Sequence, residues 1–197
     1  MGYTGAVTDY LVRMRYDVPS LEIREKGNWR RWWHKAIPVF MTLVGLVAPK
    51  FEDWFYENTV TTLGDTIYLP LGHDDGVKYF SKNFQRYGLL RHEAVHLRDW
   101  FANPVWFPFS YTLVLPAVWT TRFKWELRGY AQNMIVEMEE TGFVQYATVN
   151  WICDNLGTSA YLWAHTSPRR IIESIRDQIL DKKISGEYPD FEITKET

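Results

Sequence analysis

The sequence predicts an α+β fold that is mostly helical and carries a small β-sheet. Apolar residues recur at helical spacing in most segments after residue 79, whereas β-branched and aromatic residues gather in short segments before residue 70. Glycine and proline turn signals separate these segments. The chain has 197 residues, 46% of them hydrophobic, which is enough to bury a core. We therefore expect one domain over residues 1–197, with a polar tail at about 184–197.

Charge and cysteine content exclude several classes of protein. The 22 Lys and Arg residues nearly balance the 24 Asp and Glu residues, which leaves a net charge of −2. This balance argues against a broad nucleic-acid interface or a polybasic membrane surface. The single cysteine, Cys153, rules out an internal disulfide framework and a cysteine-based zinc finger. The aromatic content of 17% suits a groove, a partner surface or a membrane interface as well as a core.

Two apolar stretches require a test for membrane spans. Residues 36–48 form a run that is too short to cross a bilayer as a helix, and residues 105–119 are broken by Pro108 and Pro116. The start of the chain has no basic region followed by an apolar run, so we expect no secretory signal. The sequence therefore predicts no transmembrane segment.

The elements expected in the first part of the chain are short. Alternating apolar residues between 10 and 25 predict a strand, and residues 29–47 have the pattern of a helix. Residues 51–62 are rich in aromatic and β-branched residues, a composition typical of strands. Thr66–Leu69 follows a turn signal as a further short strand, and Pro70 closes it. A proline at this place fits an edge strand, which can leave one side unpaired.

We expect mostly helices in the second part of the chain, after residue 79. Apolar residues recur at helical spacing from Tyr79 to Phe101, but Gly88 weakens the first half, so we expect a helix from Leu89 to Phe101. Asn103 and Pro104 end it. Further helices are expected at residues 121–138, 143–156, 159–165 and 168–183.

The expected helix at residues 89–101 carries an HExxH motif, His92-Glu93-Ala94-Val95-His96. Histidines at positions i and i+4 lie one turn apart on the same face of a helix, so both imidazoles can reach one Zn²⁺ ion. Glu93 points beside such an ion, where it can act as a general base on a metal-bound water. Two other interpretations stay open, a helix that carries two histidines by chance and a purely structural zinc site.

A catalytic zinc ion needs a third protein ligand. The extended motif HExxHxxGxxH would supply it as a third histidine, but Ala102 stands at that position. Glu126 is the candidate that we favour. It lies on the next expected helix, and Gly129 would allow that helix to approach the HExxH helix closely. The alternative candidates for the third ligand are His73, Glu137 and Glu139.

His92 and His96 together with Glu126 resemble the metal ligands of the gluzincin clan of zinc metallopeptidases. The order of a TIYLP strand, an HExxH helix and an E-x-x-[AG]-Y-A segment resembles the minigluzincin-type proteins of bacteria and phages, over about residues 50–135. The resemblance implies a zincin-like fold with Zn²⁺ on these three residues. It also implies that Thr66–Leu69 is an edge strand that borders the active-site cleft and pairs with an extended peptide substrate.

The remaining site residues are less well defined by the sequence. Gly129 stands where such families commonly have alanine, a difference that we interpret as conservative. Tyr130, one turn beyond Glu126, is the candidate for stabilising the oxyanion, with a simple buried tyrosine as the alternative. His165 is a second candidate for that role. Asp99 lies one turn after His96, so it can either accept the free imidazole N–H or pair with a basic residue at the surface.

These observations predict a zinc-dependent, metallopeptidase-like hydrolase in which Glu93 activates a zinc-bound water toward a peptide bond. The expected partner is a peptide or protein substrate, with no nucleic acid. The resemblance favours the cytoplasm of a bacterial or phage-infected cell, or the virion. The alternative is a non-catalytic structural or assembly protein, for example a phage virion component, that keeps a zincin fold and its metal site. The many Trp and Tyr residues would suit packing in a larger protein assembly.

Overall fold

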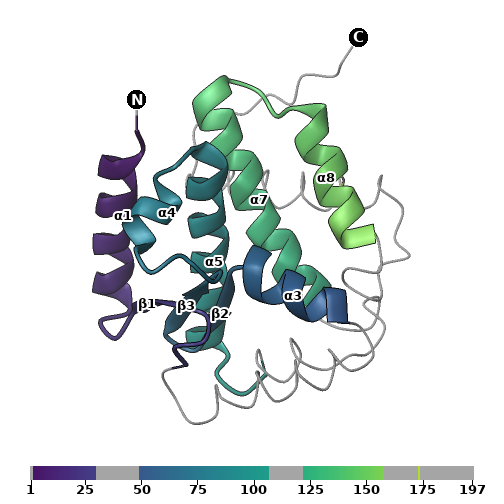
Figure 1. The fold of residues 1–197 in the computed structure, drawn as a ribbon. Helices are drawn as coiled ribbons and strands as arrows, with labels where there is room; N and C mark the ends of the chain where they lie inside the picture. Colours follow the sequence, from purple (N-terminus) through teal and green to yellow (C-terminus); the bar gives the residue numbers. More distant parts are fainter. Residues whose placement is uncertain (1, 30–48, 107–121, 158–172, 174–197) are drawn as a thin grey trace. The chain divides into compact units, whose positions relative to one another are not determined.

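The computed structural model describes residues 2–29, 49–106, 122–157 and 173. They belong to two compact units, residues 1–83 and 84–197, and each unit is described by itself. The described elements are mostly helices together with a small mixed sheet, which confirms the predicted α+β class (Figure 1). The single domain stays a prediction. Among the described helices, none combines the length and the apolar character that a membrane span requires.

The first unit contains a three-stranded sheet and several helices. In chain order these elements are α1 (Thr4–Asp17), β1 (Glu22–Glu25), α3 (Pro49–Asn58), β2 (Thr61–Leu63), β3 (Thr66–Leu69) and α4 (Gly76–Phe80). The strand order is β1-β3-β2, with β1 parallel and β2 antiparallel to β3.

The strand expected between residues 10 and 25 is wrong for most of its length, because α1 runs to Asp17 and only Glu22–Glu25 is a strand. The buried residues of α1 are Val7, Leu11 and Met14, which are spaced three and four apart and form one helical face. The short alternation that suggested a strand included Tyr16, whose side chain is 88% exposed. A helical stripe that began upstream therefore outweighed a brief alternating pattern.

The interpretation of residues 51–62 as strand-like is also wrong in its first part, where α3 extends to Asn58. The C-terminal end of this helix is held by a lysine from another segment. Lys26 Nζ donates hydrogen bonds to the backbone oxygens of Phe55 and Thr59, both at 2.6 Å. A cation at this end satisfies carbonyls that have no partner within the helix and opposes the negative end of the helix dipole.

The expectation that Thr66–Leu69 forms an edge strand is contradicted, because β3 is the central strand of the sheet. It pairs with β1 from Glu22 to Glu25 on one side and with β2 from Thr61 to Leu63 on the other. All four of its residues are buried. Pro70 lies just beyond the paired residues, so its missing N–H removes no bond from either ladder. An added peptide strand cannot pair with β3, and among the described strands β1 and β2 form the edges of this sheet.

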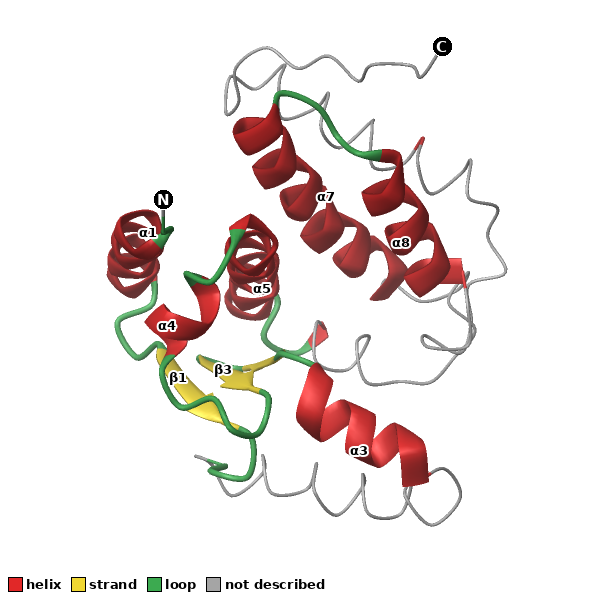
Figure 2. Ribbon diagram, turned by 45° about the horizontal axis from the view of Figure 1, so that its top comes forward, coloured by secondary structure: helices red, strands yellow, loops and turns green. Residues whose placement is uncertain are grey.

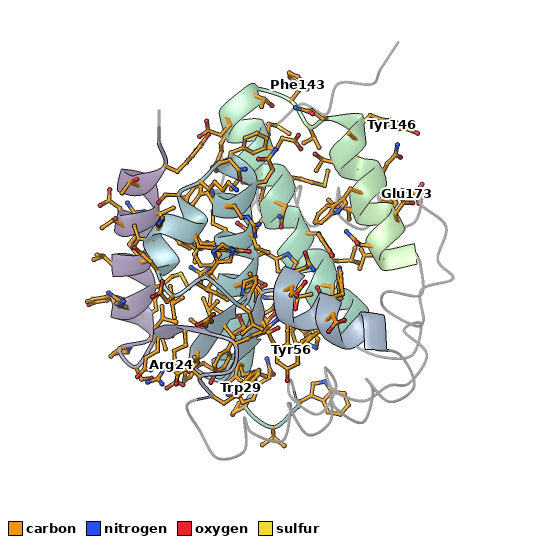
Figure 3. The ribbon with its side chains drawn as sticks, viewed as in Figure 1. Arg24, Trp29, Tyr56, Phe143, Tyr146 and Glu173 are labelled. Carbon is orange, nitrogen blue, oxygen red and sulfur yellow. The ribbon has the colours of Figure 1, made fainter. Side chains whose placement is uncertain are left out.

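The second unit is built from α5 (Phe84–Ala102), α7 (Arg122–Thr141) and α8 (Tyr146–Gly157). The helix α5 packs against α7, and α8 lies beside α7 (Figures 1 and 2). The contact between α7 and α8 buries a shared core, formed by Leu127, Tyr130, Ala131, Met134, Ile135, Ile152, Cys153 and Leu156. Gly142 ends α7 with a φ of 80°, a conformation that glycine adopts without strain. Phe143, between the two helices, and Tyr146, the first residue of α8, are exposed (Figure 3).

The helices α5 and α7 run antiparallel. Gly88 faces Asn133, His92 faces Gly129, and His96 faces Glu126, so partner positions fall along α7 as positions rise along α5. The helix α5 begins at Phe84, earlier than predicted, because Gly88 is accommodated within it. A Cβ atom at position 88 would lie 3.4 Å from Asn133 Cα, so glycine here allows a close helix contact.

The predicted helices at 121–138 and 143–156 correspond to α7 and α8. Several other expectations fall on residues that the structure does not describe. These are the helix at 29–47 (apart from residue 29), the helices at 159–165 and 168–183 (apart from residue 173), and the tail at 184–197.

Candidate metal centre

Two histidines of α5 and one glutamate of α7 converge inside the second unit. His92 and His96 lie one helical turn apart, and their Nε2 atoms are 3.0 Å from each other. Glu126 Oε2 lies 3.4 Å from His92 Nε2 and 3.7 Å from His96 Nε2. All three residues are buried, with exposed fractions of 2–5%. The structure therefore places three metal-ligating side chains around one point.

The spacing of these atoms fits a bound ion. Ligand atoms at about 2.0–2.1 Å from a tetrahedral zinc ion are about 3.3–3.4 Å from one another. The three separations of 3.0, 3.4 and 3.7 Å bracket that value. Among the described residues, this is the group of histidines and carboxylates that could hold a metal ion.

Electrostatics keep the carboxylate of this group ionised. Burial by itself would raise the pKa of Glu126, but hydrogen bonds to His92 and His96 and their charges lower this pKa well below its ordinary value. Burial lowers the pKa of His92, but the hydrogen bond to Glu126 and the charges of Glu93 and Glu126 outweigh it, so the net shift is upward. A cation is therefore favoured at this point, and a metal ion would take the place of a proton.

Gly129 makes room for the imidazole of His92. A Cβ atom at position 129 would lie 2.5 Å from His92 Nε2 and 2.6 Å from its Cε1. Real Cβ atoms do not approach other atoms so closely, so an alanine would force the ring or the helix to move. The interpretation of glycine in place of the family's alanine as a conservative difference is therefore wrong at the spacing of these helices.

Asn133 is a residue of the site that the sequence analysis missed. Its Oδ1 lies 3.1 Å from His92 Nδ1, on the side of the ring opposite the converging Nε2 atoms. It follows Glu126 by two helical turns on α7, so both residues share the face that meets α5. The spacing of Glu126, Gly129 and Asn133 is the signal that could have identified it.

Asp99 pairs with a residue of the facing helix. Its Oδ1 accepts a hydrogen bond from Arg128 Nη1 at 2.8 Å, and the side chain is 3% exposed. Asp99 therefore pairs with a basic residue, as one of the two alternatives held, but Asp99 itself is buried and only its partner Arg128 is exposed. Burial raises the pKa of Asp99 against the opposing effects of Arg128 and His96. The ion pair ties α5 to α7 one turn beyond His96.

Tyr130 packs against His92, one of the three candidate metal ligands. Its ring lies edge-on to that of His92, with centroids 4.9 Å apart, and also contacts Trp151 of α8 at 5.6 Å. Glu93 is 5% exposed, and its charge contributes to the raised pKa of His92. The ring contact places Tyr130 beside His92, and Glu93 adjoins His92 in the chain. The catalytic roles of both residues stay predictions.

The alternative third ligands have other partners. Glu137 accepts a hydrogen bond from Thr148 of α8 at 2.9 Å, and Glu139 pairs with Arg91 at 2.6 Å. The ring of His73 packs against Tyr79 within the first unit. His165 lies outside the described residues. The metal-ligating group of the described residues is thus His92, His96 and Glu126.

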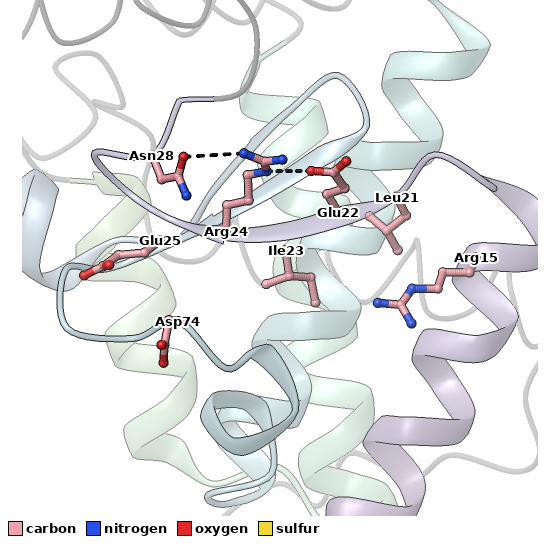
Figure 4. A pocket seen from close by; sticks show the side chains of 8 residues that line it. All are labelled: Arg15, Leu21, Glu22, Ile23, Arg24, Glu25, Asn28 and Asp74. Atoms are coloured by element: carbon pink, nitrogen blue, oxygen red, sulfur yellow. Dashed lines mark hydrogen bonds and ion pairs between the residues drawn. The ribbon is translucent and has the colours of Figure 1, made fainter.

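The first unit has a pocket of a different character along β1 (Figure 4). Its volume is about 420 Å³, and its lining consists of Arg15, Leu21, Glu22, Ile23, Arg24, Glu25, Asn28 and Asp74. Arg24 donates to Glu22 at 2.5 Å and to Asn28 at 3.4 Å. Charges in this pocket partly neutralise one another, and it contains no histidine or cysteine.

A comparison of the chain with protein-family models, curated proteins and solved structures finds no match. The resemblance to gluzincins therefore stays a prediction, and the functional interpretation depends on the residues of the site and their geometry.

Proposed function

We propose that this protein is a zinc-dependent hydrolase of the metallopeptidase type. The observation that carries the proposal is the convergence of His92 Nε2, His96 Nε2 and Glu126 Oε2 within an HExxH helix and its antiparallel neighbour. Two imidazoles and one carboxylate are a common ligand set of catalytic zinc sites, in which water takes the fourth position. When bound there, zinc would polarise the scissile carbonyl and lower the pKa of that water.

The side chains of this chain have distinct tasks in the proposal. His92, His96 and Glu126 hold the ion, and Glu126 brings the negative charge that offsets part of its charge. Glu93, adjacent to His92 on α5, accepts a proton from the attacking water and returns it to the leaving amine. Tyr130 is the candidate donor to the oxyanion, and its ring also supports the imidazole of His92.

The decisive experiment separates metal binding from turnover. Metal analysis of the purified protein should find about one zinc ion per chain, and the protein should cleave fluorogenic peptides from a mixed-sequence library. Glu93→Gln should retain zinc and abolish cleavage, because the amide cannot accept the proton. Glu126→Ala should weaken zinc binding, because it removes one ligand.

The matched control is Glu137→Gln, the same chemical change at a buried glutamate of α7 whose partner is Thr148. It should retain both zinc and cleavage. Stoichiometric iron in place of zinc would contradict the choice of metal, since two histidines and one carboxylate also suit Fe(II). A wild-type protein without any bound metal would contradict the whole proposal.

A structural metal site is the second candidate, favoured by the low exposure of the three ligands, 2–5%. Structural zinc sites are closed by four protein ligands, whereas catalytic sites keep one position for water. Substitution with Co²⁺ distinguishes the two, because added azide or a hydroxamate alters the visible spectrum only when a position is open. A closed site without cleavage would favour a non-catalytic role, such as that of an assembly protein.

A further inference from the structure

The contact between α5 and α7 has a reciprocal arrangement around the metal-ligating group. On α5, Gly88 precedes His92 by one turn, and on α7, Gly129 precedes Asn133 by one turn. Each glycine lies opposite the polar side chain of the other helix: Gly88 faces Asn133, and Gly129 faces His92. The two helices can therefore approach closely enough for the amide and the imidazole to meet between them.

We propose that Asn133 is a positioning residue of this centre, whose amide oxygen holds His92 in the tautomer that carries its proton on Nδ1. The inference rests on the proposed metal site. A neutral imidazole has one N–H donor and one acceptor nitrogen. Because the Oδ1 atom that lies 3.1 Å from Nδ1 can only accept, Nδ1 must donate. The lone pair of His92 is then on Nε2, which faces His96 and Glu126.

The neutral amide suits this position better than the carboxylate that often orients metal-bound histidines. A carboxylate at position 133 would add a second negative charge beside the imidazole of His92, which already contacts the buried Glu126, at a cost in desolvation. The amide fixes the ring without that cost, and it leaves the ligand less basic than a carboxylate partner would. The role is specific to Asn133, because the neighbouring amide of Gln132 accepts from Arg91 Nε at 3.3 Å and Nη2 at 3.1 Å instead.

The test compares three variants of the full-length protein by competition for Zn²⁺ with a chromophoric chelator. Asn133→Leu keeps a similar shape but removes the acceptor, and it should weaken zinc binding about 10- to 100-fold. Asn133→Asp restores an acceptor and should bind zinc at least as tightly as the wild type. Gln132→Leu is the matched control, which removes a neighbouring buried amide between the same helices. It should lower the melting temperature and leave zinc affinity unchanged.

Equal zinc affinities for wild type and Asn133→Leu, or an equal loss in Gln132→Leu, would overturn the assignment. Long-range ¹⁵N–¹H spectra of the metal-free protein provide a readout that does not depend on zinc binding. At a pH where His92 is neutral, they should show its proton on Nδ1 in wild type and a mixture of tautomers in Asn133→Leu. A proton on Nε2 in the wild type would overturn the inference. A wild type that binds no zinc but shows the Nδ1 tautomer would overturn only the proposed function.

Discussion

Buried polar side chains occur in both units of this protein, but their surroundings differ in kind. Lys26 in the first unit is 1% exposed, and its ammonium group donates to two backbone carbonyls and to the Thr59 hydroxyl, 3.9 Å from the centre of the Phe55 ring. In the second unit, two imidazole nitrogens and a carboxylate oxygen converge on one another. The donors of Lys26 all meet acceptors, so this group stabilises the fold. The ligand atoms of His92, His96 and Glu126 are directed at one common point, an arrangement that suits a bound cation.

The first prediction has the largest expected effect on stability and concerns Lys26 in the first unit. Lys26→Met should lower the free energy of unfolding by about 3 kcal/mol, because a charged donor is lost and the carbonyls of Phe55 and Thr59 stay buried. Urea unfolding measures the change. Lys78→Met is the control, since Lys78 is exposed, and it should change the stability by less than about 0.5 kcal/mol. Similar values for the two variants would mean that Lys26 is not a structural cation.

The second prediction concerns the space that Gly129 leaves for His92. Gly129→Ala should weaken zinc binding at least tenfold and lower the stability by about 1–3 kcal/mol, because the new Cβ atom overlaps the imidazole. Gly5→Ala in α1 is the matched control, since nothing lies within 4 Å of its Cβ position. That change should stabilise the protein by about 0.5–1 kcal/mol. Unchanged zinc affinity in Gly129→Ala would show that the helices are further apart than described.

The third prediction concerns the pH dependence of zinc binding, which leaves the stability of the fold aside. The pKa of His92 is raised above its ordinary value of 6.5, so zinc must displace a proton below that raised pKa. Affinity should therefore increase about tenfold per pH unit up to the pKa of His92 and become constant above it. The carboxylate of Glu126 contributes nothing near neutral pH, because its pKa is lowered.

Competition titrations between about pH 5 and pH 9 measure this profile. Glu126→Gln removes a negative charge that raises the pKa of His92, so the midpoint should move to lower pH. A wild-type midpoint below the ordinary pKa of histidine would contradict the described surroundings of His92.

Features set within one helix were predictable from the sequence, whereas features set by contacts between distant segments were not. His92 and His96 share a face because of the pitch of one helix, which a short motif specifies completely. The central position of β3 was not predictable from Pro70, because the choice between edge and centre depends on which distant strands pair with it. The helix α1 was not predicted because Val12, Met14 and Tyr16 alternate over a short stretch, whereas the buried face of the helix, Val7, Leu11 and Met14, begins upstream of that stretch.

The sequence by itself predicted the two helices of the candidate centre, its pair of histidines, and Glu126 as the favoured one of several third ligands. Only the tertiary structure brought Glu126 to the two imidazoles. Only the tertiary structure decided that Asn133 meets His92, that Asp99 pairs with Arg128, and that an added methyl group at position 129 would overlap the imidazole. The physical reason is that helix periodicity is set by local backbone geometry. The register of α5 against α7 is instead set by packing between residues far apart in the chain.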